Sequence, residues 1–242
     1  MQHDNVTPYK NTDPKKEQVA KMFDTIAKRY DRINTILSFG GHKNWRKKCV
    51  SLLKTKQPKI ILDVATGTGD FAIACADLKP EKITGIDISE GMMQLGREKV
   101  KDLSLNKLIT LEYGNAETLD FADNTFDAIV VGFGVRNFEN LEKGLLNLQR
   151  ILKPGGQIVI LETSFPENKF FKGVYNVGFS ILTPLIGKVF SQDKKAYDYL
   201  TNSVKAFPHN QNFVNILNKL NYKNTYYKGL GIGSVAIYYA EK

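Results

Sequence analysis

The sequence predicts an α/β fold: a seven-stranded, mostly parallel sheet with helices on both faces and one antiparallel strand. The first observation is an apolar run at residues 60–64, followed by a glycine-containing turn and a helical pattern from residue 71. The second is that apolar runs and helical patterns alternate up to residue 163, which is typical of a parallel sheet. The third is a pair of apolar runs near the end of the chain, separated by Gly229-Leu230-Gly231 and close enough in sequence to form a hairpin.

The N-terminal part, residues 1–56, predicts a helical cap on a domain that spans residues 57–242. The first 13 residues are polar and are expected to be loose. A helical pattern follows and breaks at residues 30–34, and a second, basic helix is expected at 42–54. A cap of this kind either covers an active site or completes the core, and the sequence leaves both open.

The elements that follow the cap alternate regularly. Strands are expected at residues 60–64, 82–87, 108–113, 126–132, 157–163, 222–228 and 233–240. Helices are expected at residues 71–78, 90–103, 116–119, 140–152 and 208–220. Lys153-Pro154-Gly155-Gly156 is typical of a helix end that turns into the next strand.

An apolar insertion occupies about residues 166–207. Gly178, Pro184 and Gly187 interrupt its hydrophobic pattern. Two interpretations remain open: a helical hairpin that joins the core, or a mobile lid whose apolar inner wall suits a greasy substrate.

Composition limits the classes of function. The chain of 242 residues can bury an ample core, and no stretch approaches the roughly 20 apolar residues that span a bilayer. We see no signal peptide, so we expect a cytoplasmic protein, at most peripheral at the inner face of the membrane. Cys49 and Cys75 lack metal-binding spacing, which predicts neither a disulfide framework nor a metal site.

The net charge of +9 lies entirely in the N-terminal quarter. Residues 1–60 contain 14 Lys and Arg against 5 Asp and Glu, whereas residues 61–242 contain 20 of each. These basic residues either form solvated helix faces or attract an anionic lipid surface. They are not interleaved with aromatic residues in a stacking pattern, so we expect no nucleic-acid partner.

The glycine-containing turn fits two classes of ligand. Gly67-x-Gly69-x-x-Ala72, with Asp87 twenty residues beyond Gly67, satisfies the loose dinucleotide pattern. However, Asp63 and Asp70 flank the place where a pyrophosphate would lie, which disfavours an anion. A cationic nucleoside, S-adenosyl-L-methionine, suits these carboxylates better, with Asp87 as the acceptor for its ribose hydroxyls. The alternative without a ligand is a tight turn.

Several segments together carry a family resemblance. They are Phe23-Asp24-x-Ile26-Ala27-x-x-Tyr30-Asp31-x-x-Asn34-x-x-x-Ser38-x-Gly40-x-His42-x-x-Trp45-Arg46, Leu62-Asp63-Val64-Ala65-Thr66-Gly67-Thr68-Gly69-Asp70, Gly114-Asn115-Ala116-Glu117 and Phe133-Gly134-Val135-Arg136-Asn137-Phe138. With them the chain resembles the menaquinone and ubiquinone biosynthesis C-methyltransferases, which are class I S-adenosylmethionine-dependent methyltransferases. The resemblance runs from about residue 19 to the end of the chain and implies a Rossmann-like sheet.

The glycine turn and the resemblance give a set of expected cofactor contacts. These are Asp63, Gly67, Thr68, Gly69, Asp87, Asn115 and Ala116. The resemblance implies that Thr68 lies near the methionine end, Asp87 at the ribose, and Asn115 and Ala116 beside the adenine. Many relatives have Ser where this chain has Gly132, so a side-chain contact at that position is lost here.

The resemblance also implies the reaction, in which a ring carbon of a prenylated quinol, demethylmenaquinol, takes a methyl group. Arg136 follows the fourth strand and stays charged, so it either stabilises a quinolate oxygen or fixes the loop at 133–137. The candidates for a base are Tyr30, Asp31, His42, Tyr197 and His209.

Other functions remain as alternatives. Methylation of a benzoquinol in the ubiquinone pathway needs the same scaffold, and another small-molecule methyltransferase or a non-catalytic cofactor-binding module is also compatible with the chain. A nucleic-acid methyltransferase is disfavoured, because Gly132-Phe133-Gly134-Val135-Arg136 stands where an Asn/Asp-Pro-Pro-aromatic run is usual. A homodimer is compatible with the sequence, which does not decide the oligomeric state.

Overall fold

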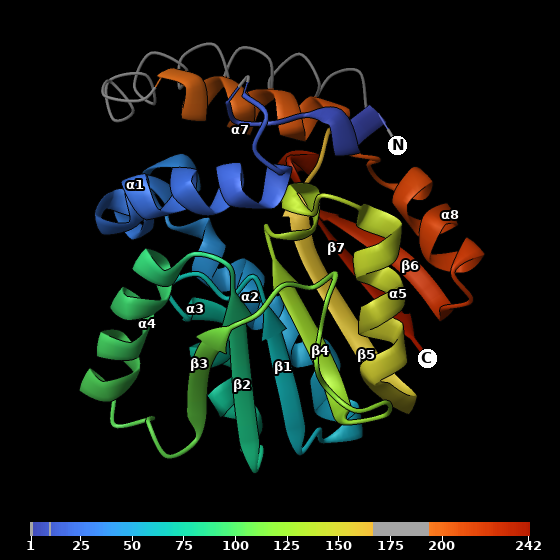
Figure 1. Ribbon diagram of the computed structural model, residues 1–242. Helices are drawn as coiled ribbons and strands as arrows, with labels where there is room; N and C mark the ends of the chain where they lie inside the picture. Colours follow the sequence, from blue (N-terminus) through green and yellow to red (C-terminus); the bar gives the residue numbers. More distant parts are fainter. Residues whose placement is uncertain (1, 10, 167–193) are drawn as a thin grey trace.

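One sheet forms the centre of the protein, in a computed structural model that describes residues 2–9, 11–166 and 194–242. Its strands are β1 (Ile60–Val64), β2 (Lys82–Asp87), β3 (Ile109–Tyr113), β4 (Phe126–Gly132), β5 (Leu152–Thr163), β6 (Lys223–Leu230) and β7 (Val235–Glu241). They lie in the order β3-β2-β1-β4-β5-β7-β6 (Figure 1). The first five run parallel and β7 is antiparallel to both of its neighbours. The predicted sheet is therefore confirmed.

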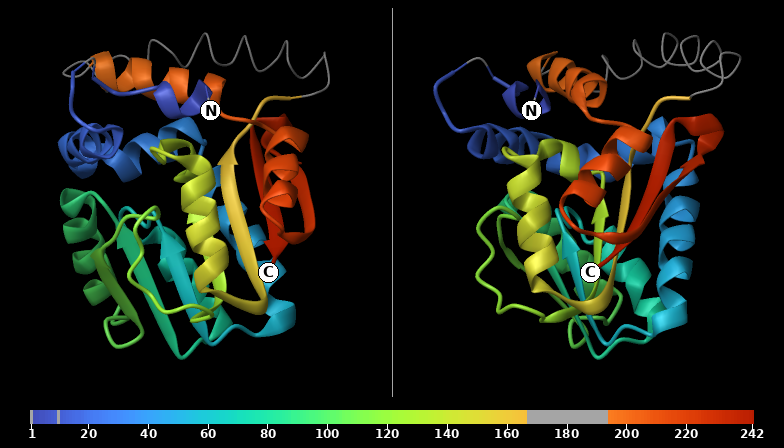
Figure 2. Two further views of the ribbon diagram at one scale, coloured as in Figure 1. Left: turned by 45° about the vertical axis from the view of Figure 1, so that its right-hand side comes forward. Right: turned by 90° about the vertical axis from the view of Figure 1, so that its right-hand side faces the viewer.

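Helices cover both faces of the sheet. On one face lie α2 (Gly41–Leu53), α3 (Asp70–Cys75) and α4 (Glu90–Asp102), and on the other lie α5 (Leu141–Ile151) and α8 (Gln211–Lys219). Figure 2 shows α1 (Lys15–Leu37) and α7 (Lys194–Ala206) lying across the carboxyl ends of the parallel strands. Short 3-10 helices are η1 (Gln2–Asn5), η2 (Lys54–Lys56), η3 (Ala76–Leu78), η4 (Val135–Asn137) and η5 (Gly231–Gly233).

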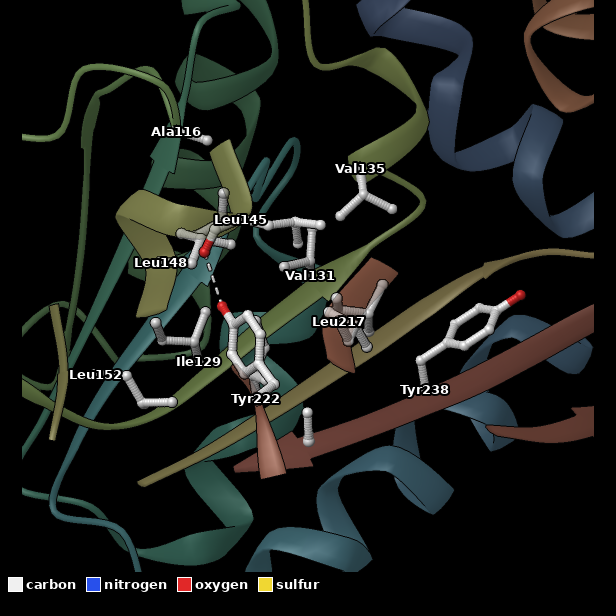
Figure 3. Close-up of a cluster of buried hydrophobic side chains, with 14 of the residues drawn as sticks. Ala116, Ile129, Val131, Val135, Leu145, Leu148, Leu152, Leu217, Tyr222 and Tyr238 are labelled. Atoms are coloured by element: carbon white, nitrogen blue, oxygen red, sulfur yellow. Dashed lines mark hydrogen bonds between the residues drawn. The ribbon is translucent and has the colours of Figure 1, made fainter. Parts of the chain in front are cut away.

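Both faces of the sheet are buried, which explains why these strands are continuous apolar runs in the sequence. Leu62 on β1 packs in the core beneath α5 and α8, whereas its neighbour Ile61 packs in the core beneath α2 and α3. Figure 3 shows the first of these cores, where the Tyr222 hydroxyl donates a hydrogen bond to the carbonyl of Leu145 (2.8 Å). Each large apolar side chain buried in this way stabilises the fold by about 1.5–3 kcal/mol.

Three local predictions were wrong. Helix α1 does not break at residues 30–34 but continues to Leu37, because tertiary contacts outweigh the local loss of pattern: Asp31 accepts hydrogen bonds from Thr68 and Lys99. Residues 116–119 form a turn rather than a helix, in which the Asn115 side chain accepts a hydrogen bond from the backbone N–H of Glu117 (3.0 Å). The expected loose N-terminus instead contains η1, whose His3 is buried.

The helices expected to form a cap do not all lie over the edge of the sheet. α1 crosses the edge of the sheet, but α2 packs its Cys49, Val50 and Leu53 against a sheet face and belongs to that layer. Residues 167–193 of the expected insertion lie outside the described residues. The helix that follows, α7, packs Ala196 and Tyr199 against α1. Within the described parts of the chain, no helix is both long enough and apolar enough to cross a membrane.

Candidate active site

A cavity lies between α1 and the carboxyl ends of β1, β2 and β4. Its volume is about 660 Å³, the part open to solvent included. Ligand sites of doubly wound sheets lie at this edge. Its lining comprises Lys16, Val19, Phe23, Tyr30, Val64, Ala65, Gly67, Asp87, Ile88, Met92, Gly114, Asn115, Ala116, Glu117, Gly132, Phe133, Gly134, Asn137, Phe138 and Glu139.

The turn after β1 brings backbone, rather than side chains, to the cavity. Gly67 and Gly69 have φ values of +55° and +78°, which side chains rarely adopt. At Gly134 a Cβ atom would lie 2.5 Å from the Cβ of Ala65, so only glycine lets the end of β4 approach this turn. Gly67 lines the cavity, whereas Gly69 precedes α3 as its N-cap and does not.

Asp87 ends β2 and reaches the cavity with both carboxylate oxygens held. One oxygen accepts a hydrogen bond from the Gly67 N–H and the other from the Ser89 N–H, each at 2.8 Å. Burial raises the pKa of Asp87 to about 6, although these two bonds favour its charged form. Because a carboxylate can accept about four hydrogen bonds, Asp87 keeps capacity for the hydroxyl groups of a ligand.

Two further acids in the cavity wall were not singled out from the sequence. Glu117 is buried and accepts hydrogen bonds from the backbone N–H groups of Glu139 (2.7 Å) and Asn140 (3.1 Å). Glu139 also lines the cavity, and Lys16 is the only basic residue in its lining within the described chain. With Asp87 the lining thus has three carboxylates against one ammonium, which favours a cationic ligand.

Asp63 and Asp70 do not line this cavity. The prediction that these two carboxylates flank the ligand and favour a cation was therefore wrong. Asp63 is fully buried, and its Oδ2 accepts hydrogen bonds from the Thr66 hydroxyl (2.6 Å) and the Ala72 N–H (2.9 Å). Its Oδ1 has no partner among the described residues, and burial raises its pKa to about 7. Asp63 therefore shapes the glycine turn from inside the protein.

Asp70 belongs to a charged group on the other side of the turn, which we call the Lys99 cluster: Asp31, Arg46, Thr68, Asp70 and Lys99. The Lys99 ammonium donates hydrogen bonds to Asp31 (2.7 Å), Asp70 (2.7 Å) and Thr68 (3.1 Å). Thr68 also donates to Asp31 (2.7 Å), and Arg46 pairs with Asp70 at 3.1 Å. Burial raises the pKa of Asp70, but Arg46 and Lys99 outweigh it and hold that pKa below its usual value. No member of this cluster lines the cavity.

Comparison with known proteins identifies the family of this chain. The model of the ubiE/COQ5 methyltransferase family matches residues 11–242. The chain belongs to this family. It is 45% identical to a demethylmenaquinone methyltransferase of Bacteroides fragilis over 99% of this chain and 98% of that protein. It is 40% identical to a ubiquinone/menaquinone biosynthesis C-methyltransferase UbiE of Geobacter sulfurreducens over 98% of this chain and 93% of that protein.

A solved structure supports the fold. A protein from Thermotoga maritima described as a SAM-dependent methyltransferase covers 92% of this chain and 99% of its own length, with a TM-score of 0.61 and 19% identity. At that identity the likeness shows the fold alone. The family resemblance and the methyltransferase activity predicted from the sequence are thus confirmed, as is the Rossmann-like sheet.

In this ubiE/COQ5 family member, Arg136 is turned toward protein groups. Its Nη1 donates hydrogen bonds to Glu162 and to the carbonyl of Phe133, both at 2.7 Å. Arg136 does not line the cavity, but its neighbours Phe133 and Asn137 do. Sequence reasoning missed Glu162, although an acid at the carboxyl end of an apolar strand was a signal for it.

Among the candidates for a base, Tyr30 is the one that reaches the cavity within the described chain. Burial raises the pKa of its hydroxyl. His42 accepts or donates a hydrogen bond at Ser38 (2.6 Å), and burial, with Arg46, lowers its pKa. His209 contacts the carbonyls of Thr163 (3.1 Å) and Val204 (2.6 Å) away from the cavity. The side chain of Tyr197 lies outside the described residues.

Proposed function

We propose that this family member is a C-methyltransferase that converts demethylmenaquinol to menaquinol with S-adenosyl-L-methionine as methyl donor. The observation that carries the proposal is the acidic cavity at the carboxyl edge of the sheet, with Asp87 held at the end of β2. The names of the two relatives support the reaction and the class of acceptor.

The residues of the cavity fit the donor. Asp87 has hydrogen-bonding capacity for the two ribose hydroxyls, and Asn115 with Ala116 lies where the chain leaves β3, suited to the adenine edge. Gly67 offers backbone without a Cβ atom. When bound, S-adenosylmethionine supplies an electrophilic methyl group, and its positive charge suits a wall with Glu117 and Glu139.

We assign the roles of Arg136 and Tyr30 from their contacts. Arg136 organises the loop at 133–137, because its guanidinium is bonded to Glu162 and to the loop's own backbone. Tyr30 stays protonated at neutral pH, since burial raises its pKa, so its hydroxyl can donate a hydrogen bond to an oxygen of the quinol ring. Such a bond would orient the ring carbon toward the methyl donor.

Methylation of a benzoquinol is the second candidate, favoured by the name of the Geobacter relative, a ubiquinone/menaquinone biosynthesis C-methyltransferase. The test is transfer of a radiolabelled methyl group from S-adenosylmethionine to short-chain demethylmenaquinol and, in parallel, to the demethylated benzoquinol. We expect the naphthoquinol to be methylated with the higher kcat/KM. Labelling of the benzoquinol alone would reverse the order of the two candidates, and labelling of neither would overturn both.

We also propose that the protein binds anionic lipid through the corner between α1 and α2. Phe39 is 84% exposed and Ile36 is 41% exposed at this corner. Lys43 and Lys47 are exposed on α2, and the sequence has no acid between Asp31 and Asp63. An apolar tip with a basic surround is suited to a lipid surface, where each basic residue contributes about 1 kcal/mol.

Vesicle sedimentation tests this lipid contact. We expect binding to phosphatidylglycerol vesicles that weakens as salt rises, little binding to phosphatidylcholine, and weaker binding of Phe39→Ser. Leu146→Ser is the matched control, because Leu146 is 48% exposed on α5. Equal weakening by both substitutions, or partitioning that ignores salt, would contradict the proposed corner.

A further inference from the structure

The N-terminal turn η1 packs on the loop that carries Arg136. Figures 1 and 2 show η1 beside α7, above the carboxyl ends of the parallel strands. His3 is 1% exposed, and its ring lies edge-on to Phe207, with 5.8 Å between the ring centroids. Buried polar side chains are normally hydrogen-bonded, so the partners of the His3 ring should explain its burial.

His3 holds the backbone of Arg136. Its Nε2 lies 2.5 Å from the carbonyl oxygen of Arg136. Because a carbonyl can only accept, Nε2 must carry the proton and donate this bond. The other ring nitrogen, Nδ1, lies 3.1 Å from Asp4 Oδ1. The bond to Arg136 is therefore made whether the ring is neutral or doubly protonated.

Two more contacts join the start of the chain to the same loop. The backbone N–H of Leu141 donates to Asp4 (3.4 Å), and the backbone N–H of Lys15 donates to Glu139 (2.9 Å). Lys15 is 4% exposed, and its ammonium donates to the carbonyl of His3 (3.2 Å). The loop is thus held near both of its ends.

This loop is part of the cavity wall. Asn137, Phe138 and Glu139, which directly follow Arg136, line the cavity. Arg136 is consequently fixed on two sides, by Glu162 at its guanidinium and by His3 at its carbonyl. The match to the family model begins at residue 11, so His3 lies outside the matched segment.

We propose that His3 is a positioning residue for methyl transfer, which acts by fixing the Arg136 carbonyl and with it the loop at 136–139. The expected effect on kcat rests on the proposed function. The expected ordering of the loop by His3 is independent of that function. The geometry requires an N–H donor at the position of Nε2. An apolar side chain of similar volume would not supply this hydrogen bond.

Two substitutions separate donation from packing. His3→Gln keeps a side-chain N–H near the position of Nε2, whereas His3→Leu keeps a similar volume without a donor. We expect His3→Leu to lower kcat about fivefold, the effect of one lost buried hydrogen bond, with an unchanged KM for S-adenosylmethionine. We expect His3→Gln to keep kcat within twofold. Asn5→Ala, at an exposed position of the same turn, is the control.

Hydrogen exchange of the intact chain is read in parallel, and it does not depend on the reaction. We expect the amides of residues 136–139 to exchange faster in His3→Leu than in His3→Gln or Asn5→Ala. Equal kcat and equal exchange in the Leu and Gln variants would overturn the proposal, because a donor would then be irrelevant. Faster exchange in His3→Leu without any methyl transfer by the native chain would instead overturn the proposed function and leave the positioning contact supported.

Discussion

The two sides of the glycine turn carry similar numbers of acids but treat them differently. On the cavity side, Asp87 is bonded to backbone N–H groups and Glu117 likewise, with no cation paired to either among the described residues. On the other side, Asp31 and Asp70 are bound by Lys99 at 2.7 Å each. The glycine turn at residues 66–69 separates the two sides, and the sequence predicted one ligand site around it.

This difference shows that the hydrogen-bond partner of an acidic side chain decides the role of that side chain. Backbone N–H groups hold a carboxylate in place without cancelling its charge, so the cavity stays negative and can attract a cation. A Lys or Arg partner cancels that charge and ties elements together. The Lys99 cluster in this way links α1, α2, α3 and α4 beneath the turn.

Removal of the cavity-side acid should have the largest effect. We expect Asp87→Ala to weaken binding of S-adenosylmethionine roughly 100-fold, because two charge-assisted hydrogen bonds to the ribose are lost. Isothermal titration calorimetry measures it. Asp70→Asn is the matched control on the other side, with a change below about fivefold expected. Similar losses in both would erase the distinction between the two sides.

Breaking the Lys99 cluster should instead cost stability. Lys99→Met leaves Asp31 and Asp70 without their shared ammonium, and we expect the free energy of unfolding to fall by about 2 kcal/mol, measured in urea. Affinity for S-adenosylmethionine should fall only a few-fold, through the turn. Lys43→Met, at an exposed position of α2, should change neither quantity. A loss of affinity as large as that of Asp87→Ala would argue for a direct ligand contact here.

Asp63 gives an effect that depends on pH. Its pKa is raised from 3.8 to about 7, so the folded protein holds this proton to higher pH than the unfolded chain does. The resulting stability is present at low pH and is lost as pH rises from about 4 to 7. We expect Asp63→Asn to lack this loss, so the difference in free energy of unfolding between the variant and the native chain should change by about 2 kcal/mol between pH 5 and pH 7. Parallel curves for the two proteins would show that Asp63 is already ionised in the fold.

Gly132→Ser should have the smallest effect. A Cβ atom at Gly132 would lie 3.0 Å from Cδ1 of Phe71, so the ring has to shift slightly. We expect a loss of stability below about 1 kcal/mol, and a change in affinity for S-adenosylmethionine within about threefold, since Gly132 lines the cavity. Thermal unfolding and calorimetry measure the two. A loss of several kcal/mol would mean that the ring of Phe71 cannot move.

The sequence predicted where a candidate residue lies when its position along a strand fixed its place. Asp87 follows β2 directly, and Asn115 and Ala116 follow β3, so parallel strands bring all three to one edge. Prediction of place was less successful for Asp31 and His42, named as candidates for a base, because neither lines the cavity. Their side chains are turned to Lys99 and Ser38, partners that no local pattern reveals.

The sequence by itself determined the order of strands and helices, the glycine turn and the acid at the end of β2, because these follow from patterns that span a few residues. Only the tertiary structure decided which acids remain unneutralised at the cavity, since Lys99 lies 68 residues from Asp31 in the chain. It also decided that η1 belongs to the cavity's support, through a hydrogen bond between His3 and Arg136 across 133 residues. Contacts between distant segments form only when packing brings those segments together, so no local sequence pattern predicts them.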